Sequence, residues 1–169
     1  MKSVEEITEN VVHLRKEKHF QEAEDILRAA IAHDSNAWQL WNQLGHVLVA
    51  KEKYAEAASA FEAATELNPN GFWLWISLGY ARKENTQLDG AIEATLRATK
   101  LTTEPNEIGS ALYNLGCYTC IAGKHDEALG YLEVAFQNDE SIREWARDDL
   151  DLESLKTDKR FLKLLKTSQ

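Results

Sequence analysis

The residues whose types and spacing best suit chemistry are two cysteines three positions apart, Cys117 and Cys120. A C-x-x-C pair can form a redox disulfide or supply half of a zinc site. The apolar pattern predicts a helix over residues 112–121, so the pair lies near a helix carboxyl end, where the dipole disfavours a thiolate. Zinc would need further ligands, and the sequence has no second cysteine pair. We favour packing over redox chemistry or metal binding, and free thiols suit a reducing compartment.

Motifs typical of enzymes are missing from the sequence. It contains no Gly-rich phosphate loop, no H-E-x-x-H and no G-x-S-x-G, which are the local patterns of nucleotide, zinc-protease and hydrolase chemistry. The carboxylates are scattered along the predicted helix exteriors, where solvation is their ordinary role. We therefore expect no enzyme activity, no cofactor and no resident metal.

Charge and hydropathy exclude further classes. The 169 residues amount to one domain of chain, and 28 acidic residues against 19 basic ones give a net charge of −9 and a pI near 5.1. Such a chain repels nucleic acids, because their binding depends on Lys and Arg displacing counterions. No apolar run approaches the ~18 residues of a membrane span, and residues 1–6 resemble no signal peptide. We expect no membrane span and a cytoplasmic location.

A repeat runs through most of the chain. The pair Leu44-Gly45 recurs as Leu78-Gly79 after 34 residues and as Leu115-Gly116 after 37 more. Two columns of alanines keep the same steps: Ala23, Ala57, Ala91 and Ala128, and Ala30, Ala64, Ala98 and Ala135. A fixed period of this length is typical of stacked supersecondary units. The predicted array covers residues 1–142, with units 4–37, 38–71, 72–105 and 109–142.

Each unit is predicted to contain two helices. Apolar residues recur at i, i+3, i+4 and i+7 on both sides of a short turn, which is residues 51–53 in the second unit. Asn36, Asn70 and Asn106 are the expected N-caps, and Pro69 and Pro105 are expected just outside helices.

Small and large residues at repeated positions predict the packing. Glycine in a helix costs about 0.5–1 kcal/mol, so Gly45, Gly79 and Gly116 indicate close helix approach, with Ala57, Ala91 and Ala128 expected opposite them. The aromatic residues Trp41, Trp75 and Phe61 are expected to fill the space between units, and we give them no role in binding.

The second unit resembles the tetratricopeptide repeat family, whose pattern is W-x2-LG-x2-Y, then A-x3-F-x2-A, then P. The residues in those places are Trp41, Leu44-Gly45, Leu48, Ala57, Phe61, Ala64 and Pro69. The third and fourth units keep fewer of these residues, and the first is degenerate. The resemblance implies an all-α fold: a right-handed α-solenoid of about four helix-turn-helix units with a C-terminal capping helix.

Residues 143–169 form the predicted cap, because a stacked array leaves an apolar face at its end. Asp158 is the expected N-cap of a last short helix, whose apolar stripe is Phe161, Leu162, Leu164 and Leu165. The open alternative is a basic amphipathic helix that binds a membrane surface or a calmodulin-type partner.

The resemblance also implies a concave groove lined by the first helix of each unit. Carrying the inward positions of the family onto this sequence gives the candidate ligand residues Asn42, Gln43, His46, Trp73, Ile76, Ser77, Tyr80, Tyr113, Asn114 and Cys117. Aromatic rings and amides suit a peptide with apolar anchors. Burial or an ordinary surface position is the alternative for each residue.

One branch of the family clamps acidic chaperone tails with cationic side chains. The matching places here are Thr8, Val12, Gln43, Trp73 and Ser77, none of them cationic, so we expect no such tail to bind. The predicted function is a non-enzymatic protein-interaction module: an adaptor, an assembly scaffold or a chaperone. The alternatives are a self-associating scaffold, whose groove receives a segment of another copy, and a dedicated secretion chaperone.

Overall fold

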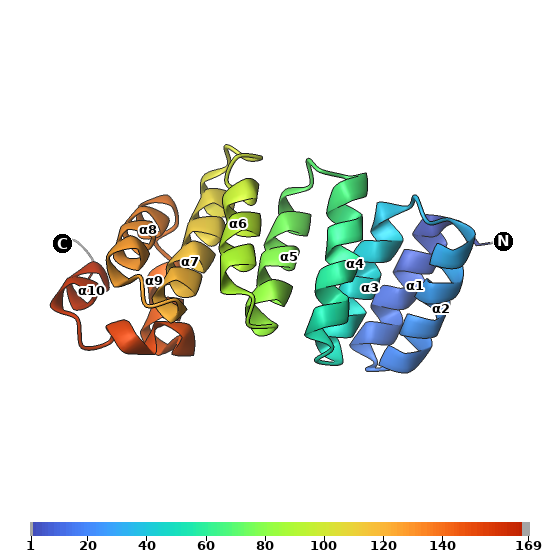
Figure 1. Ribbon diagram of the computed structural model, residues 1–169, viewed down its shortest axis with the longest axis horizontal. Coiled ribbons are helices and arrows are strands. Elements are labelled where there is room, and N and C mark those ends of the chain that lie inside the picture. Colours follow the sequence, from blue (N-terminus) through green and yellow to red (C-terminus); the bar gives the residue numbers. More distant parts are fainter. Residues whose placement is uncertain (1, 167–169) are drawn as a thin grey trace. The chain divides into compact units, whose positions relative to one another are not determined.

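The computed structural model describes residues 2–166, and all of its regular elements are helices (Figure 1). The predicted all-α class of consecutive helical hairpins is confirmed. Residues 167–169, which belong to the predicted cap, and Met1, the first residue of the predicted array, lie outside the described residues. Within residues 2–166, no helix is both long and apolar enough to cross a membrane.

The chain forms two compact units, Met1–Thr86 and Gln87–Gln169. The first holds five helices: α1 (Val4–Lys16), α2 (Phe20–His33), α3 (Trp38–Ala50), α4 (Tyr54–Leu67) and α5 (Phe72–Glu84). In this unit α1 packs on α2 and α3, α2 on α3, α3 on α4, and α4 on α5. Its core consists of fully buried side chains, among them Val11, Leu27, Leu48, Phe61 and Leu78.

The second unit contains the predicted cap as well as helices of the array. Its elements are α6 (Leu88–Ala98), α7 (Pro105–Ile121), α8 (His125–Asn138), α9 (Ile142–Asp148), the 3-10 helix η1 (Leu150–Leu155) and α10 (Lys159–Leu164). Helix α7 packs on α6 and α8, while η1 packs on α7 and α10 packs on α8. The side chains of Ile142, Leu152, Leu155 and Phe161 are fully buried in one cluster with Leu132 of α8. The last helices therefore extend the core of this unit.

The repeat is visible in the backbone at the turn of each predicted hairpin. Lys18, Glu52 and Thr86 all have φ near +60°, and Gly123 has φ of +75°. These four positions follow the same steps of 34, 34 and 37 residues as the sequence repeat. The left-handed conformation lets the chain leave one helix and enter the next within a few residues. The predicted turn at residues 51–53 is confirmed.

The predicted helix starts need two corrections. Asn36, Asn70 and Asn106 are not N-caps; those positions are Ala37, Gly71 and Glu104, and no side chain caps any of the three helices. Pro105 is the first residue of α7, not a residue outside it. Helix α7 consequently starts four residues before the predicted boundary at Gly109, because proline suits the first helical position, where a missing N–H costs nothing.

Recurring tryptophans tie each helix start to the loop before it. The indole Nε1 of Trp41 donates to the Ser35 carbonyl (2.8 Å), and that of Trp75 donates to the Pro69 carbonyl (2.9 Å). Both bonds span six residues, so the same local contact occurs in successive repeats. The sequence predicted that these side chains fill the space between units. In the structure they are partly exposed, and they also hold the preceding loop.

Two glycines accommodate large neighbouring side chains. A Cβ atom on Gly45 would lie 2.5 Å from Cε1 of Phe61, and one on Gly116 would lie 2.7 Å from Cδ2 of Leu132. The three atoms nearest to that Cβ position on Gly45 all belong to Phe61, so the alanine expected opposite Gly45 stays a prediction. For Gly116, the carbonyl of Ala128 does lie 3.4 Å away. Each glycine leaves room for a ring or branched chain of the facing helix.

Candidate functional site

Helix α5 presents an exposed stripe of apolar side chains. Trp73 is 57% exposed and Tyr80 is 40% exposed, and seven residues, or two helical turns, separate them on one face. Ile76 and Ser77 lie between them on the same stripe and are half-buried. Leu74 and Leu78 are buried. The stripe is therefore open to a ligand over two turns.

Neighbouring contacts hold the two aromatic rings of this stripe. Phe72 meets Trp73 edge to face, with ring centres 4.9 Å apart. The ammonium of Lys83 lies 5.6 Å from the centre of the Tyr80 ring. Burial raises the Tyr80 pKa, with a smaller contribution from the charge of Glu84, so its hydroxyl stays protonated at neutral pH. Tyr80 thus offers a neutral ring and a hydrogen-bonding group.

Helix α3 contributes the polar part of the same unit. Asn42, Gln43 and His46 are all half-buried. The Gln43 side chain accepts a hydrogen bond from Arg15 of α1, with Nη1 and Oε1 3.0 Å apart. The His46 ring packs edge-on against Phe61, with centres 5.1 Å apart. Within residues 2–166, no hydrogen bond is seen for the side chain of Asn42 or for that of His46.

Arg15 is the residue that sequence reasoning missed. The sequence analysis found no cation at the expected clamp positions. The Arg15 guanidinium nevertheless bonds to Gln43 and lowers the pKa of His46. Burial, with the charge of Arg15 second, lowers the pKa of His46 to about 4, so the imidazole is neutral at pH 7. Arg15 follows the predicted inward residue Val12 by three positions, so extending that stripe by one turn would have found it.

Tyr113 and Cys117 of α7, predicted to line an open groove, are buried in the second unit. They are 8% and 3% exposed. The Tyr113 hydroxyl donates to Asp149 Oδ2 at 2.5 Å, and Cys117 Sγ lies 3.7 Å from the same oxygen. Asn114 is half-buried. A ligand would reach Tyr113 and Cys117 only by displacing the segment 149–155, which we call the covering segment.

The covering segment also contacts the second cysteine. Sγ of Cys120 lies 3.1 Å from Oγ of Ser154, which lies 3.1 Å from Nε2 of His125. Burial raises the pKa of both thiols, strongly for Cys117, where the Asp149 charge adds to the effect. The thiolate is the reactive form, so neither thiol is activated as a nucleophile. Both cysteines are free, and they lie in the last turns of α7, near the carboxyl end as predicted.

A cluster of potential metal ligands includes one of these thiols. Ligand atoms of Cys117, Asp149 and Asp151 all lie within 4.8 Å of one another. A metal would have to compete with the proton of a thiol whose pKa is raised and with the bond from Tyr113 to Asp149. The geometry therefore favours hydrogen bonds that hold the covering segment against α7 over a metal site. Our expectation of no metal at the cysteines stays a prediction.

Comparison with known families identifies one repeat within the chain. Residues 38–70 match the model described as tetratricopeptide repeat. This segment is a tetratricopeptide repeat. The matched repeat is the hairpin of α3 and α4, which carries Asn42, Gln43 and His46. No curated protein matches the sequence.

Solved structures of tetratricopeptide proteins share the fold. A crystal structure of MamA is 19% identical, covers 98% of this chain and 94% of its own, and has a TM-score of 0.77. YrrB is 22% identical over 94% of this chain and 80% of its own, with a TM-score of 0.73. MamA from Desulfovibrio magneticus RS-1, from residue 41 to its end, is 23% identical over 81% and 76%, with a TM-score of 0.72. At these identities the likeness shows the fold of the tetratricopeptide repeat.

Proposed function

We propose that this tetratricopeptide protein is a non-enzymatic interaction module that binds a peptide or protein segment on the first unit. The observation that carries the proposal is the exposed stripe of α5, where Trp73 and Tyr80 stand two turns apart. Large rigid aromatic side chains are typical anchors of protein interfaces, because they bury much area and lose little rotamer freedom. A segment with apolar side chains would bury this stripe.

Polar groups on α1 and α3 supply orientation in this proposal. Asn42 and Gln43 would hydrogen-bond the backbone of the segment, and Arg15 would hold an acceptor that displaces its bond to Gln43. His46 is neutral at pH 7 because its pKa is lowered to about 4, so it would add a hydrogen bond and no charge. One half-buried cation does not make the multi-residue clamp of acidic chaperone tails, and we keep that partner class disfavoured.

A binding role also agrees with what is said of a similar structure. YrrB is described as a TPR protein with an unusual peptide-binding site. Extended surfaces of stacked repeats generally serve as binding sites. The thiols of α7 have raised pKa values, so the strongest catalytic candidates of the sequence lack the activated form an enzyme would need. The cytoplasm remains the proposed location, where such free thiols persist.

Self-association is the second candidate, and one feature of the first unit favours it. A hollow of about 410 Å³ at the amino-terminal hairpin is lined largely by apolar side chains, including Ile7, Ile26 and Ala29. Another copy could cover it. The end of the chain is a poor occupant, because Phe161 and Leu165 are already buried in their own second unit. Concentration-dependent light scattering tests this candidate.

The test of the proposed site compares two exposed tryptophans. Trp73 on α5 is 57% exposed and Trp145 on α9 is 62% exposed, so either can be replaced by alanine with little change in the core. Proteins captured by the wild type are identified, and the affinity for the bound segment is then measured. Trp73→Ala should weaken binding by about 2 kcal/mol, because burying the exposed half of an indole is worth that much at ~25 cal/mol/Å².

Trp145→Ala is the matched control and should leave the affinity unchanged. Circular dichroism must show equal helicity for both variants. If Trp73→Ala binds the segment as tightly as the wild type does, the aromatic stripe is not the site.

A further inference from the structure

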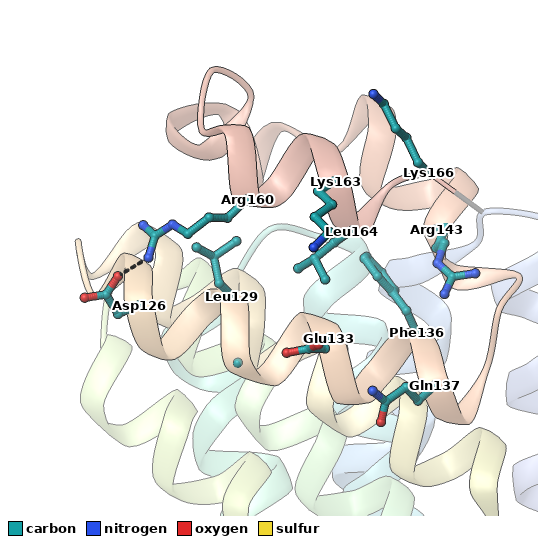
Figure 2. Close-up of a pocket in the computed structure, with 11 residues that line it drawn as sticks. Asp126, Leu129, Glu133, Phe136, Gln137, Arg143, Arg160, Lys163, Leu164 and Lys166 are labelled. Carbon is teal, nitrogen blue, oxygen red and sulfur yellow. Dashed lines mark hydrogen bonds and ion pairs between the residues drawn. The ribbon is translucent and has the colours of Figure 1, made fainter. Parts of the chain in front are cut away.

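A second surface in the second unit has the features of a binding site that is separate from the stripe of α5. A cavity of about 600 Å³ opens between α8 and the elements that follow it, α9 and α10 (Figure 2). Its apolar lining comes from Leu129 and Phe136 of α8 and from Leu164 of α10. Neither cysteine belongs to its lining. We call this surface the α8–α10 cavity.

The charged side chains that line the α8–α10 cavity are mostly basic, although the chain as a whole is acidic. Four basic side chains line it, Arg143, Arg160, Lys163 and Lys166, against only two acidic ones, Asp126 and Glu133, whereas the whole chain has a net charge of −9. Figure 2 shows Arg160 at one end of the cavity, bonded to Asp126, and Arg143 and Lys166 toward the other end, where the Phe136 ring also lies. The basic groups therefore surround an apolar floor.

Not all of these cations are available to a ligand. Arg160 is held by Asp126 at 2.6 Å and by Asp158 at 2.7 Å. Within residues 2–166, by contrast, Lys163 and Lys166 have no ion-pair partner. These two ammonium groups come from α10 and from the residues just after it.

Arg143 provides the most specific indication of a ligand. Its Nη1 pairs with Glu140 at 2.6 Å, and its guanidinium lies 5.6 Å from the centre of the Phe136 ring. Its Nε is buried and has no hydrogen-bond partner among the described residues. A buried unpaired donor is destabilising and is rare in folded proteins. Because Nε is itself buried, an acceptor oxygen from a bound molecule would satisfy it only after a shift of the Arg143 side chain.

We propose that the α8–α10 cavity binds an acidic peptide segment that carries an apolar side chain. The apolar side chain packs on Phe136, Leu129 and Leu164, and the carboxylates beside it bind Lys163, Lys166 and Arg143. An apolar floor with a basic rim suits this combination. A nucleic acid would be repelled by the net negative charge of the chain.

The test uses a dye-labelled peptide, Glu-Glu-Leu-Phe-Glu-Glu, and fluorescence anisotropy with the full chain. We expect binding that weakens as salt is added, because exposed ion pairs are screened. Two control peptides carry serines in place of Leu-Phe or glutamines in place of the glutamates. The affinity of each should be lower by at least about tenfold. A Kd of ~1 mM corresponds to a binding free energy of about −4 kcal/mol. If the acidic peptide does not bind at this concentration, the proposal is overturned.

Charge reversal at the rim has a matched control on the same helix. The double variant Lys163→Glu, Lys166→Glu should lose affinity by about tenfold or more, because two attractions become repulsions. Lys159→Glu changes an exposed lysine of α10 that does not line the cavity, and it should change the affinity by less than about twofold. Equal losses in both variants would show that only the overall charge matters, and would overturn the site.

A blocking variant tests the cavity without removing any contact. Gly130 lies within α8 and lines the cavity, and a Cβ there would meet no atom within 4 Å. Gly130→Leu should therefore fold at least as well as the wild type, since glycine is a poor helix former, and should reduce peptide binding by about tenfold. Unchanged binding by this folded variant contradicts the proposal.

Other occupants give distinct results. Tight binding to phosphatidylserine vesicles in preference to the peptide would indicate a membrane surface, and loss of self-association in Gly130→Leu would indicate a second copy; either overturns the peptide assignment. Trp73→Ala should leave anisotropy binding of the acidic peptide unchanged, because Trp73 belongs to the first unit. That variant separates the failure of this proposal from the failure of the proposed function.

Discussion

Replacement of Glu24 by glutamine tests the ion cluster that joins the first two hairpins. The Glu24 carboxylate on α2 is only 5% exposed, yet it pairs with three cations: Lys51 at 2.6 Å, Arg28 at 2.7 Å and Lys53 at 3.6 Å. Lys51 and Lys53 belong to the turn between α3 and α4. The cluster therefore connects the first hairpin to the turn of the second, in the unit that carries the aromatic stripe.

The magnitude follows from the pKa of Glu24. Hydrogen bonding from Lys51, assisted by Arg28 and opposed by burial, lowers this pKa from 4.5 to about 2. A depressed carboxyl pKa contributes stability at pH values above the unfolded pKa, and a shift of this size corresponds to about 3 kcal/mol. The contribution is complete above about pH 5 and is lost as the pH falls from about 4.5 toward 2. Glu24→Gln should therefore destabilise by about 3 kcal/mol at pH 7 and by progressively less in acid.

The assay is urea unfolding followed by tryptophan fluorescence at several pH values. Glu22→Gln on the same helix is the matched control, because Glu22 is 63% exposed and contacts only His19, at 3.8 Å, among the described ion pairs. It should cost less than about 0.5 kcal/mol. Equal costs for the two variants at pH 7, or a Glu24→Gln cost that does not shrink at about pH 3, would refute the reasoning.

Two further predictions concern packing and the covering segment. Gly45→Ala should lower the free energy of unfolding by about 1–3 kcal/mol, because its Cβ would lie 2.5 Å from Phe61; Gly130→Ala, which meets open space, should instead raise it by about 0.5–1 kcal/mol, and thermal denaturation that ranks them the other way would contradict this packing. Tyr113→Phe should speed hydrogen exchange in residues 149–155 and alkylation of Cys117, because it removes the bond to Asp149. Tyr131→Phe, which removes a hydroxyl without a hydrogen bond to residues 2–166, is its control, and equal exchange rates in the two variants would show that the Tyr113 bond does not hold the segment.

The period of the sequence was enough to predict the hairpins of the array. Helices α1, α3 and α5 begin at Val4, Trp38 and Phe72, the first residues of three of the predicted units. These starts are predictable because each depends on local contacts that recur with the repeat, such as the bonds of Trp41 and Trp75 to the preceding loop. The exposure of Trp73 and Tyr80 was also predictable, since it follows from the position of each residue around one helix.

Contacts between distant segments were not predictable in the same way. The covering segment reaches Tyr113 and Cys117 from 36 and 32 residues away, and no periodicity of α7 indicates which later residues will lie on it. The position of Arg15 beside Gln43 likewise depends on how α1 packs on α3. The α8–α10 cavity combines α8 of the last repeat with the later helices α9 and α10, whose sequence has no repeat to compare with.

The two units thus differ in what they offer a partner. On α5 the stripe is open, and a ligand that binds it need displace nothing but water. On α7 the equivalent positions are covered, and a ligand there would first break the Tyr113–Asp149 bond and expose Leu152 and Leu155, which are fully buried. Uncovering two leucines costs about 3 kcal/mol or more, or over a hundredfold in affinity. Binding therefore favours the first unit, unless a partner recovers that cost through its own contacts.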